Sequence, residues 1–168
     1  MPYQDRWQRC VNCQVLFFNG HADGNKGKCS GSPNGQGHYA GGDGGNFSSY
    51  ELAHDEWVES AQDSWRNCWN CQAMYFDGHS DGNKGHCPAG GAHDGHGSEP
   101  STYNFTLPFN VADNGVNVRN WRNCWKCQAM VFDGDPDDKG RCAADGGTHE
   151  CHADIAWNFV LPWSQGIH

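Results

Sequence analysis

A cysteine-containing segment occurs three times in the chain, and its middle copy reads Trp65-Arg66-Asn67-Cys68-Trp69-Asn70-Cys71-Gln72-Ala73-Met74-Tyr75-Phe76. Two similar copies begin at Trp7 and Trp121, so the first tryptophans lie 58 and 56 residues apart. A period of this length is typical of a supersecondary unit that cannot bury its own apolar face and packs on its neighbours. We predict one domain over residues 1–168 with three units at 1–58, 59–114 and 115–168, arranged about a pseudo-threefold axis.

The units are predicted to consist of short β-strands. Residues 73–76 and 103–107 are aromatic-rich runs bounded by Asp-Gly or Pro, and Asp77-Gly78 and Asp133-Gly134 are turn signals. No stretch has the apolar period of a helix. The fold class is therefore all-β, trefoil-like or prism-like, with residues 55–63 and 110–119 as the connections between units.

The composition requires a stabilising element other than aliphatic packing. The chain has only 4 Leu, 2 Ile, 8 Val and 8 Phe in 168 residues, a share low enough to suggest disorder. However, 8 Trp and 10 Cys indicate an ordered fold with a small aromatic core. In a cysteine-rich chain the missing stability comes from disulfides or from bound metal.

The cysteine spacing favours metal. Each unit has a Cys-x-x-Cys turn, a third cysteine 15 or 16 residues later and then a histidine, which together make a Cys3His set suited to tetrahedral zinc. Three cysteines per unit cannot all pair within the unit, which disfavours a disulfide framework. Four protein ligands leave no open position for water, so three structural Zn²⁺ ions are expected. The predicted ligands are Cys10, Cys13, Cys29 and His38; Cys68, Cys71, Cys87 and His93; and Cys124, Cys127, Cys142 and His149.

The tenth cysteine, Cys151, has no counterpart in the other two units. It could replace His149 as a ligand, pair with another thiol or be spare. These three alternatives stay open at the level of the sequence.

Charge and motifs exclude several classes of function. The formal net charge is −9 and no basic cluster is present, so neither a nucleic-acid partner nor attraction to an anionic bilayer is expected. No apolar run is long enough for a membrane span or a signal peptide, which predicts a protein that is cytoplasmic or released without a classical signal. No nucleophile elbow, phosphate loop or helical zinc-protease motif is present, and we predict that the protein is not an enzyme.

The Gly/Asp-rich loop after each Cys-x-x-Cys segment is the predicted ligand-binding region. It combines carboxylate, amide, imidazole and ammonium groups that can bind sugar hydroxyls, although the same composition also suits a solvated turn. Three such sites on one body would bind a multivalent glycan surface by avidity. The predicted contacts are His21, Asp23, Asn25 and Lys26; Asp77, His79, Asp81, Asn83 and Lys84; and Asp133, Asp135, Asp137 and Lys139.

The chain also resembles a known kind of tandem repeat. The resemblance rests on Trp-x-x-Cys-x-x-Cys-Gln-x-x-x-Phe-(Asp/Asn)-Gly, on the Cys-Pro-Ala-Gly-Gly-Ala-His-Asp run at 87–94, and on the closing aromatic-x-Leu pair. Repeats of this type occur in actinobacterial and fungal proteins, mostly uncharacterised and sometimes beside lectin-like or hydrolase modules. The plan is also similar to that of small threefold lectins, which implies carbohydrate recognition.

The sequence thus predicts a lectin whose partners are glycans or glycoconjugates, on a structural-zinc scaffold. Two alternatives remain: a non-catalytic protein-interaction, self-assembling or toxin-targeting module, and a zinc-dependent enzyme. The sugar and the oligomeric state are left open.

Overall fold

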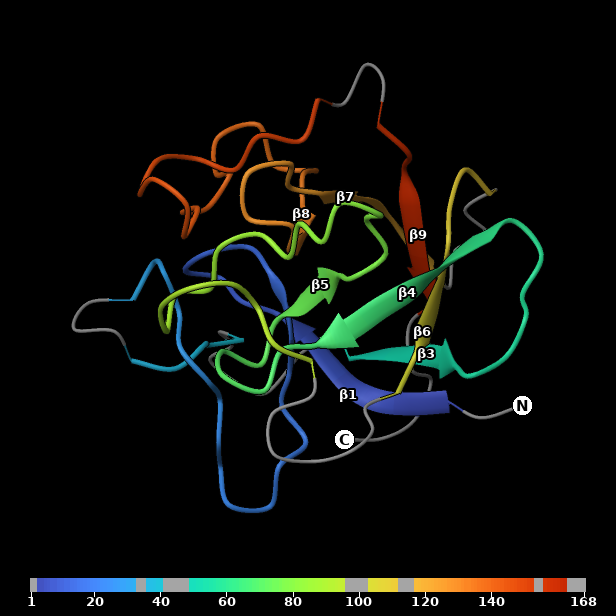
Figure 1. The fold of residues 1–168 in the computed structure, drawn as a ribbon, viewed down its shortest axis with the longest axis horizontal. Coiled ribbons are helices and arrows are strands. Elements are labelled where there is room, and N and C mark those ends of the chain that lie inside the picture. The colour runs from blue at the N-terminus through green and yellow to red at the C-terminus, as the bar shows by residue number, and fades with distance from the viewer. Residues whose placement is uncertain are drawn as a thin grey trace.

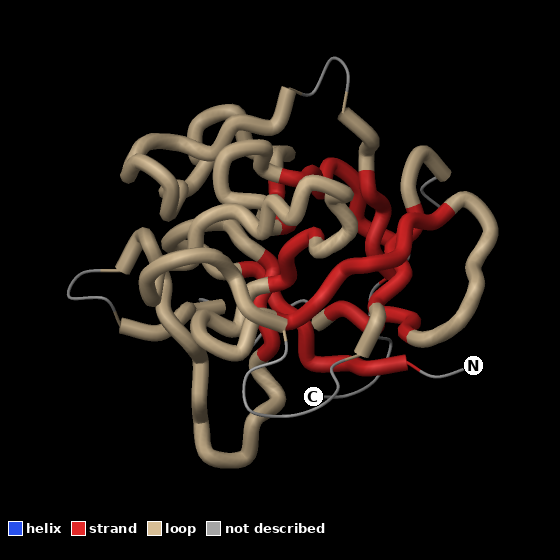
Figure 2. The backbone as a smooth tube through the Cα atoms, viewed as in Figure 1, coloured by secondary structure: helices blue, strands red, loops and turns tan. Residues whose placement is uncertain are grey.

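The structure is a computed structural model that describes residues 3–32, 36–40, 49–95, 103–111, 117–152 and 156–162. These residues form nine β-strands and no helix, with long loops on one side of the strands (Figures 1 and 2). The strands are β1 (Tyr3–Arg9), β2 (Leu16–Phe18), β3 (Tyr50–His54), β4 (Ala61–Asn67), β5 (Met74–Phe76), β6 (Phe105–Pro108), β7 (Asn117–Asn123), β8 (Met130–Phe132) and β9 (Phe159–Pro162).

Each unit contributes a three-stranded antiparallel sheet with its long first strand in the centre. In the first unit Trp7 pairs with Phe18 of β2 on one side and with Tyr50 of β3 on the other. The equivalent tryptophans, Trp65 and Trp121, have the same two kinds of partner. Repetition of the register shows that one local sequence pattern builds all three sheets.

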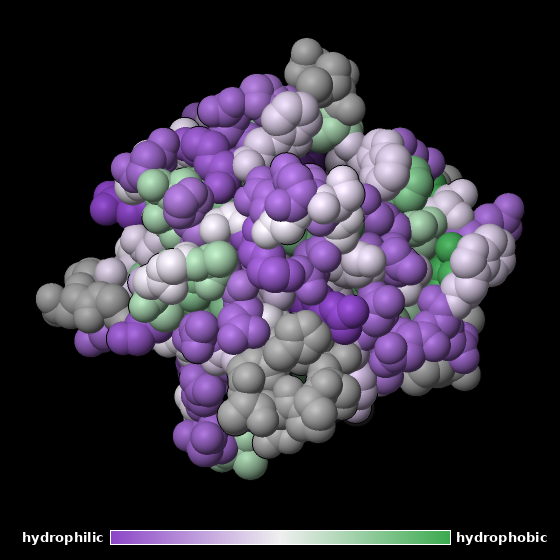
Figure 3. Space-filling view, in the orientation of Figure 1, coloured by the Kyte–Doolittle hydropathy of each residue, from purple (hydrophilic) through white to green (hydrophobic). Residues whose placement is uncertain are grey.

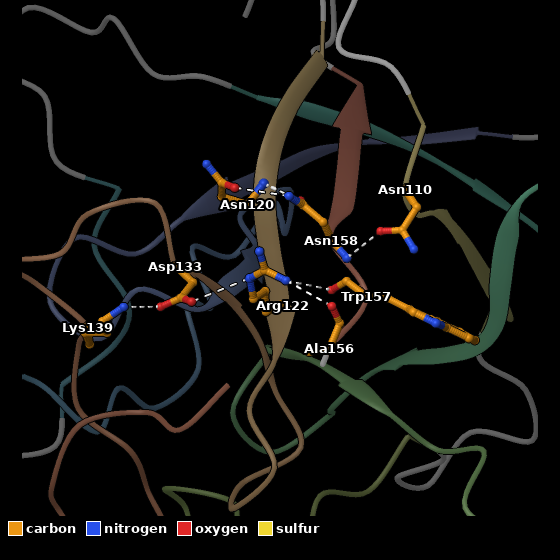
Figure 4. Close-up of polar contacts among 8 residues, drawn as sticks. All are labelled: Asn110, Asn120, Arg122, Asp133, Lys139, Ala156, Trp157 and Asn158. Carbon is orange, nitrogen blue, oxygen red and sulfur yellow. Dashed lines mark hydrogen bonds and ion pairs between the residues drawn. The ribbon is translucent and has the colours of Figure 1, made fainter. Parts of the chain in front are cut away.

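A β-bulge precedes each of these tryptophans. Its residue has positive φ: 69° at Arg6, 70° at Ser64 and 73° at Asn120. The side chain just before the third strand accepts a hydrogen bond from the bulge N–H, as Asn158 Oδ1 does from Asn120 N at 2.7 Å (Figure 4). The bulge shifts the strand register, and the tryptophan that follows it is fully buried.

The three sheets associate around a common axis. Strands β3 and β6 pair and join the first two units into one six-stranded sheet, while β9 lies against both of them. At the opposite end three single bridges run in a cycle from unit to unit. These bridges are Phe17 to Ala73, Tyr75 to Ala129 and Val131 to Val15. The result is a nearly closed barrel with pseudo-threefold symmetry.

Two buried clusters fill this barrel. One is an aromatic layer around Trp7, Trp65 and Trp121, each of which packs against a phenylalanine of its own unit and an aromatic ring of another unit. The other contains the cysteines and the small residues of the axial bridges. The small aromatic core predicted from composition is therefore present, next to a second core built around sulfur.

The predicted fold class is confirmed: the described chain is all-β and has three similar units. The connections between units are shorter than the predicted 55–63 and 110–119, because β4 begins at Ala61 and β7 at Asn117. Residues 61–64 lack the apolar alternation of a strand, since they are half-exposed or exposed and are held mainly by backbone pairing with β6. The domain boundaries themselves stay a prediction.

Candidate metal centres

The Cys-x-x-Cys turn of each unit, here called the knuckle, lies between the first and second strands at residues 10–13, 68–71 and 124–127. In the first knuckle Gln14 N donates to Cys10 O at 2.7 Å and Cys10 N donates to Val15 O at 2.9 Å. Gln14 adopts a φ of 67°, which turns the chain sharply into β2. Both thiols of the knuckle consequently point to one side, and the loop after β2 brings a third cysteine and a histidine to them.

The structure brings the twelve predicted ligands together in three buried clusters. In the first, Cys10 Sγ lies 3.6 Å from Cys29 Sγ, and Cys13 Sγ lies 3.5 Å from His38 Nδ1. The corresponding pairs measure 3.8 and 3.5 Å in both other units. The clusters are Cys10, Cys13, Cys29 and His38; Cys68, Cys71, Cys87 and His93; and Cys124, Cys127, Cys142 and His149.

These separations fit a tetrahedral metal ion. Bonds of about 2.3 Å to sulfur and about 2.0 Å to nitrogen place two sulfurs about 3.8 Å apart and a sulfur and a nitrogen about 3.5 Å apart. A disulfide would require sulfurs at about 2.05 Å, and all ten cysteines are free thiols. The clusters are thus compatible with a metal ion such as zinc, as predicted, and the disulfide framework is ruled out.

Backbone amides support the thiolates of each cluster. Tyr39 N donates to Cys10 Sγ and Gly31 N donates to Cys29 Sγ, both at 3.4 Å. Hydrogen bonds from Cys13 and Cys29 also hold the pKa of Cys10 well below its ordinary value, whereas burial raises the pKa of Cys13. Equivalent amide–sulfur contacts occur at Cys68, Cys87 and Cys142. This environment suits a deprotonated sulfur ligand, because hydrogen bonds offset part of its negative charge.

The second nitrogen of each histidine ligand reaches another unit. Nδ1 faces the thiols, and Nε2 donates to the carbonyl oxygen of the second knuckle cysteine of the neighbouring unit. The distances are 2.9 Å from His38 to Cys71, 3.0 Å from His93 to Cys127 and 2.9 Å from His149 to Cys13. Such an outer hydrogen bond fixes the tautomer and orientation of a ligating histidine.

Cys151 is buried and stands outside the three clusters, where His149 is the fourth ligand. Its counterpart in the second unit is Gly95, at which an added Cβ would lie only 2.8 Å from the Tyr75 hydroxyl. In the third unit Val131 replaces that tyrosine, and Cys151 belongs to the same apolar cluster. We interpret Cys151 as a packing residue that fills the space a tyrosine occupies in the second unit.

Several polar side chains of the predicted ligand-binding loops make hydrogen bonds within the loop or to a neighbouring unit. Asp23 Oδ1 accepts from Asn25 N and Asn25 Oδ1 accepts from Gly27 N, both at 3.0 Å. Asp81, Asn83 and Asp135 make the same local bonds in the other units. The two loop histidines face a neighbouring unit, with His21 at 2.9 Å from Gln72 Oε1 and His79 at 2.9 Å from Gln128 Oε1. Asp137 is exposed.

The remaining predicted loop residues close the base of each loop. Asp133 pairs with Lys139 at 2.6 Å and with Arg122 at 3.5 Å, and Arg122 also donates to the carbonyls of Ala156 and Trp157 (Figure 4). In the second unit Asp77 likewise pairs with Lys84 and Arg66. The first unit replaces this trio by Gln8, Asn19 and Lys26. Exchange of both Arg and Asp for neutral amides leaves the net charge of the trio unchanged.

Sequence reasoning missed two kinds of residue at these centres. Gln14, Gln72 and Gln128 follow the knuckles at φ of 64–67°, and each carbonyl accepts a backbone N–H from another unit. Asp138 was passed over as well, although its Oδ2 accepts from Gln14 Nε2 at 3.0 Å, in place of the histidine used by the other units. The invariant Gln after each knuckle was the signal that could have identified the first group.

An open hollow of about 520 Å³ lies beside the first knuckle. Tyr39 is one of its lining residues and is 52% exposed, while its carbonyl accepts a hydrogen bond from Val11 N at 2.9 Å. The hollow is lined by the neutral polar residues Asn12, Ser32 and Gln36 and by one lysine, Lys26.

No protein-family model, curated protein or solved structure matches the chain. The resemblance to the tandem repeat therefore stays a prediction. Within the residues that the structure describes, there is no helix that could cross a membrane.

Proposed function

We propose that the protein is a non-enzymatic carbohydrate-binding protein built on a zinc-binding scaffold. The observation that carries this proposal is the hollow beside the first knuckle, where an exposed aromatic ring and neutral hydrogen-bonding groups adjoin. The four-ligand Cys3His clusters supply the rigid base, and a closed set of ligands suits a structural metal.

The chemistry of the hollow suits a sugar. A pyranose has an apolar face that can lie on an aromatic ring and hydroxyl groups that exchange hydrogen bonds with amides and hydroxyls. Tyr39 offers the ring, while Asn12 and Gln36 offer both donors and acceptors. The volume is within the usual range of about 300–1,000 Å³ for small-molecule sites.

The second and third units have an exposed aromatic residue within the knuckle itself. Trp69 and Trp125 lie within the second and third knuckles and are 37% and 47% exposed. In the first unit Val11 stands at that position, and the exposed ring comes instead from Tyr39. Three aromatic positions on one rigid body support multivalent binding, which increases affinity through effective concentration.

This assignment moves the proposed contacts away from most of the loop residues. Of the loop residues predicted from sequence, Lys26 lines the hollow, whereas His21 and His79 face neighbouring units. The visible surface is largely hydrophilic with small separate apolar areas (Figure 3), which suits weak polar contacts repeated over several sites.

A second candidate is a protein-interaction module. It is favoured by Trp57, which is 82% exposed, and by Tyr103 and Trp157, which are 46% and 44% exposed and stack on His54 and Phe109. Exposed aromatic side chains are enriched at protein interfaces.

The deciding experiment is binding of the labelled, zinc-loaded protein to a broad glycan array. We expect a family of related glycans, competition by the free sugar, and loss of at least about tenfold in affinity in Tyr39→Ala. Tyr3→Ala is the matched control, because Tyr3 is 49% exposed and lies on β1. A blank array at high protein concentration would overturn the carbohydrate proposal and favour the interaction module.

A further inference from the structure

We propose that the three metal centres gain and lose their ions as a set, because the histidine ligand of each centre is oriented by the knuckle of the next unit. This inference does not depend on carbohydrate binding. It rests on three contacts that repeat around the pseudo-threefold axis, all directed at the second cysteine of a knuckle or at the glutamine that follows it.

The first contact is the hydrogen bond of the histidine ligand. His93 Nε2 donates to Cys127 O at 3.0 Å, so a ligand of the second centre is oriented by the backbone of a ligand of the third. The equivalent bonds of His38 and His149 continue the cycle in the same direction. Every centre therefore both gives and receives one such bond.

The second contact is a glycine that packs on the same carbonyl. Gly85 has φ of 71°, and a Cβ added to it would lie 2.0 Å from Cys127 O. Gly27 and Gly140 have φ of 69° and 70°, and a Cβ added to them would lie 2.0 Å from Cys71 O and 2.1 Å from Cys13 O. Only a residue without a side chain permits this approach, so the loop of one unit docks directly on the next knuckle.

The third contact follows one residue later. The carbonyl of Gln128 accepts the N–H of Phe76 at 2.9 Å, and the carbonyls of Gln72 and Gln14 accept those of Phe18 and Phe132 at 3.0 and 2.8 Å. A strand, a loop and a metal ligand of one unit are thus all attached to a knuckle whose shape depends on its own metal ion.

These contacts couple the centres energetically. An ion that fixes both cysteines of a knuckle also fixes the carbonyl that orients the histidine of the preceding centre, which lowers the entropic cost of binding there. The coupling closes into a ring, so no centre is terminal. Couplings between sites typically change affinity by about 5- to 150-fold.

Native mass spectrometry of the metal-free protein titrated with Zn²⁺ tests the inference. At half saturation we expect mainly species with no ion and with three ions. Independent centres would instead leave about three quarters of the molecules with one or two ions. That distribution in the natural chain would overturn the proposal.

Gly85→Ala separates this coupling from general folding cooperativity. The substitution disturbs the contact with Cys127 O and leaves all twelve ligands intact. We expect a several-fold rise of the species with one or two ions. Gly82→Ala is the matched control, because Gly82 has φ of 80° in the same loop but would place its Cβ in open space. Equal distributions for the two variants would contradict the coupling mechanism.

Discussion

His149 Nε2 lies 2.9 Å from the carbonyl oxygen of Cys13, a residue 136 positions earlier in the chain. This hydrogen bond joins the third unit to the first and closes the cycle that the other two histidines begin. A linear array of repeats has terminal units with a free face, whereas a closed ring has none. Because the bond links the first and third units through a metal ligand, we expect the stability of the barrel to depend on the orientation of His149.

Replacement of His149 by cysteine should separate the two roles of this residue. Nδ1 is the nitrogen that faces the thiols, and Sγ of a cysteine projects from Cβ toward the same place, so a centre of four thiolates can still hold zinc. The Cys13 carbonyl would lose its donor, which should cost about 1–3 kcal/mol in the free energy of unfolding. Metal analysis and denaturant titration measure the two effects. A variant with three ions and unchanged stability would show that the bond between units is unimportant.

Cys71→Ser should abolish the second centre and unfold the second unit, and the coupling between centres should lower the zinc occupancy of the other two. Loss of a thiolate ligand removes much of a metal-binding free energy of about 10–16 kcal/mol, and the poor aliphatic core cannot replace it. Zinc content and amide hydrogen exchange over β4 to β6 provide the readout. Cys151→Ala is the matched control, because Cys151 is also buried but lies outside the clusters; it should retain three ions. Full metal content in Cys71→Ser would contradict a structural role.

The metal ligands could be predicted from sequence because their spacing repeats three times and zinc geometry is demanding. Both the fold class and the cluster composition follow from such local patterns. The contacts between units could not be predicted in this way. His21 contacts Gln72 of the next unit because of the way the units pack against each other. The composition of a loop does not predict this packing.

Comparison of the three units shows pairs of positions at which the residues change together. Gly95 beside Tyr75, and Cys151 in a unit that has Val131, show substitutions that compensate for each other in volume. Arg122 with Asp133, and Gln8 with Asn19, show the same for charge. These pairs are visible in the sequence, but their meaning requires knowledge of which positions touch.

Val131→Tyr should destabilise the protein, because the larger ring would meet the side chain of Cys151 in a packed core. We expect a cost of about 1–3 kcal/mol for the single substitution. Adding Cys151→Gly recreates the combination of Tyr75 and Gly95 and should recover much of this loss. A thermodynamic double-mutant cycle measures the interaction. Additive effects would contradict the interpretation of Cys151 as a packing residue.

Asp133→Asn alone should destabilise the third unit. The carboxylate is only 7% exposed, and among the described residues it is the negative partner with which both Arg122 and Lys139 pair. The expected cost is about 1–3 kcal/mol. Combined with Arg122→Gln, the trio becomes that of the first unit, so the double variant should be more stable than the sum of the single effects predicts. Chemical denaturation of all four proteins tests this.

Removal of metal by a strong chelator should unfold the barrel. Trp7, Trp65 and Trp121 are all 0% exposed, so unfolding should shift their fluorescence emission to longer wavelength as water reaches the rings. The shift should reverse when Zn²⁺ is restored, because the binding free energy of the ions is also folding free energy. If the centres are coupled as a ring, loss of metal and the fluorescence change should follow a single transition. Complete removal of zinc with an unchanged emission spectrum would show that the aromatic layer is stable without the metal centres.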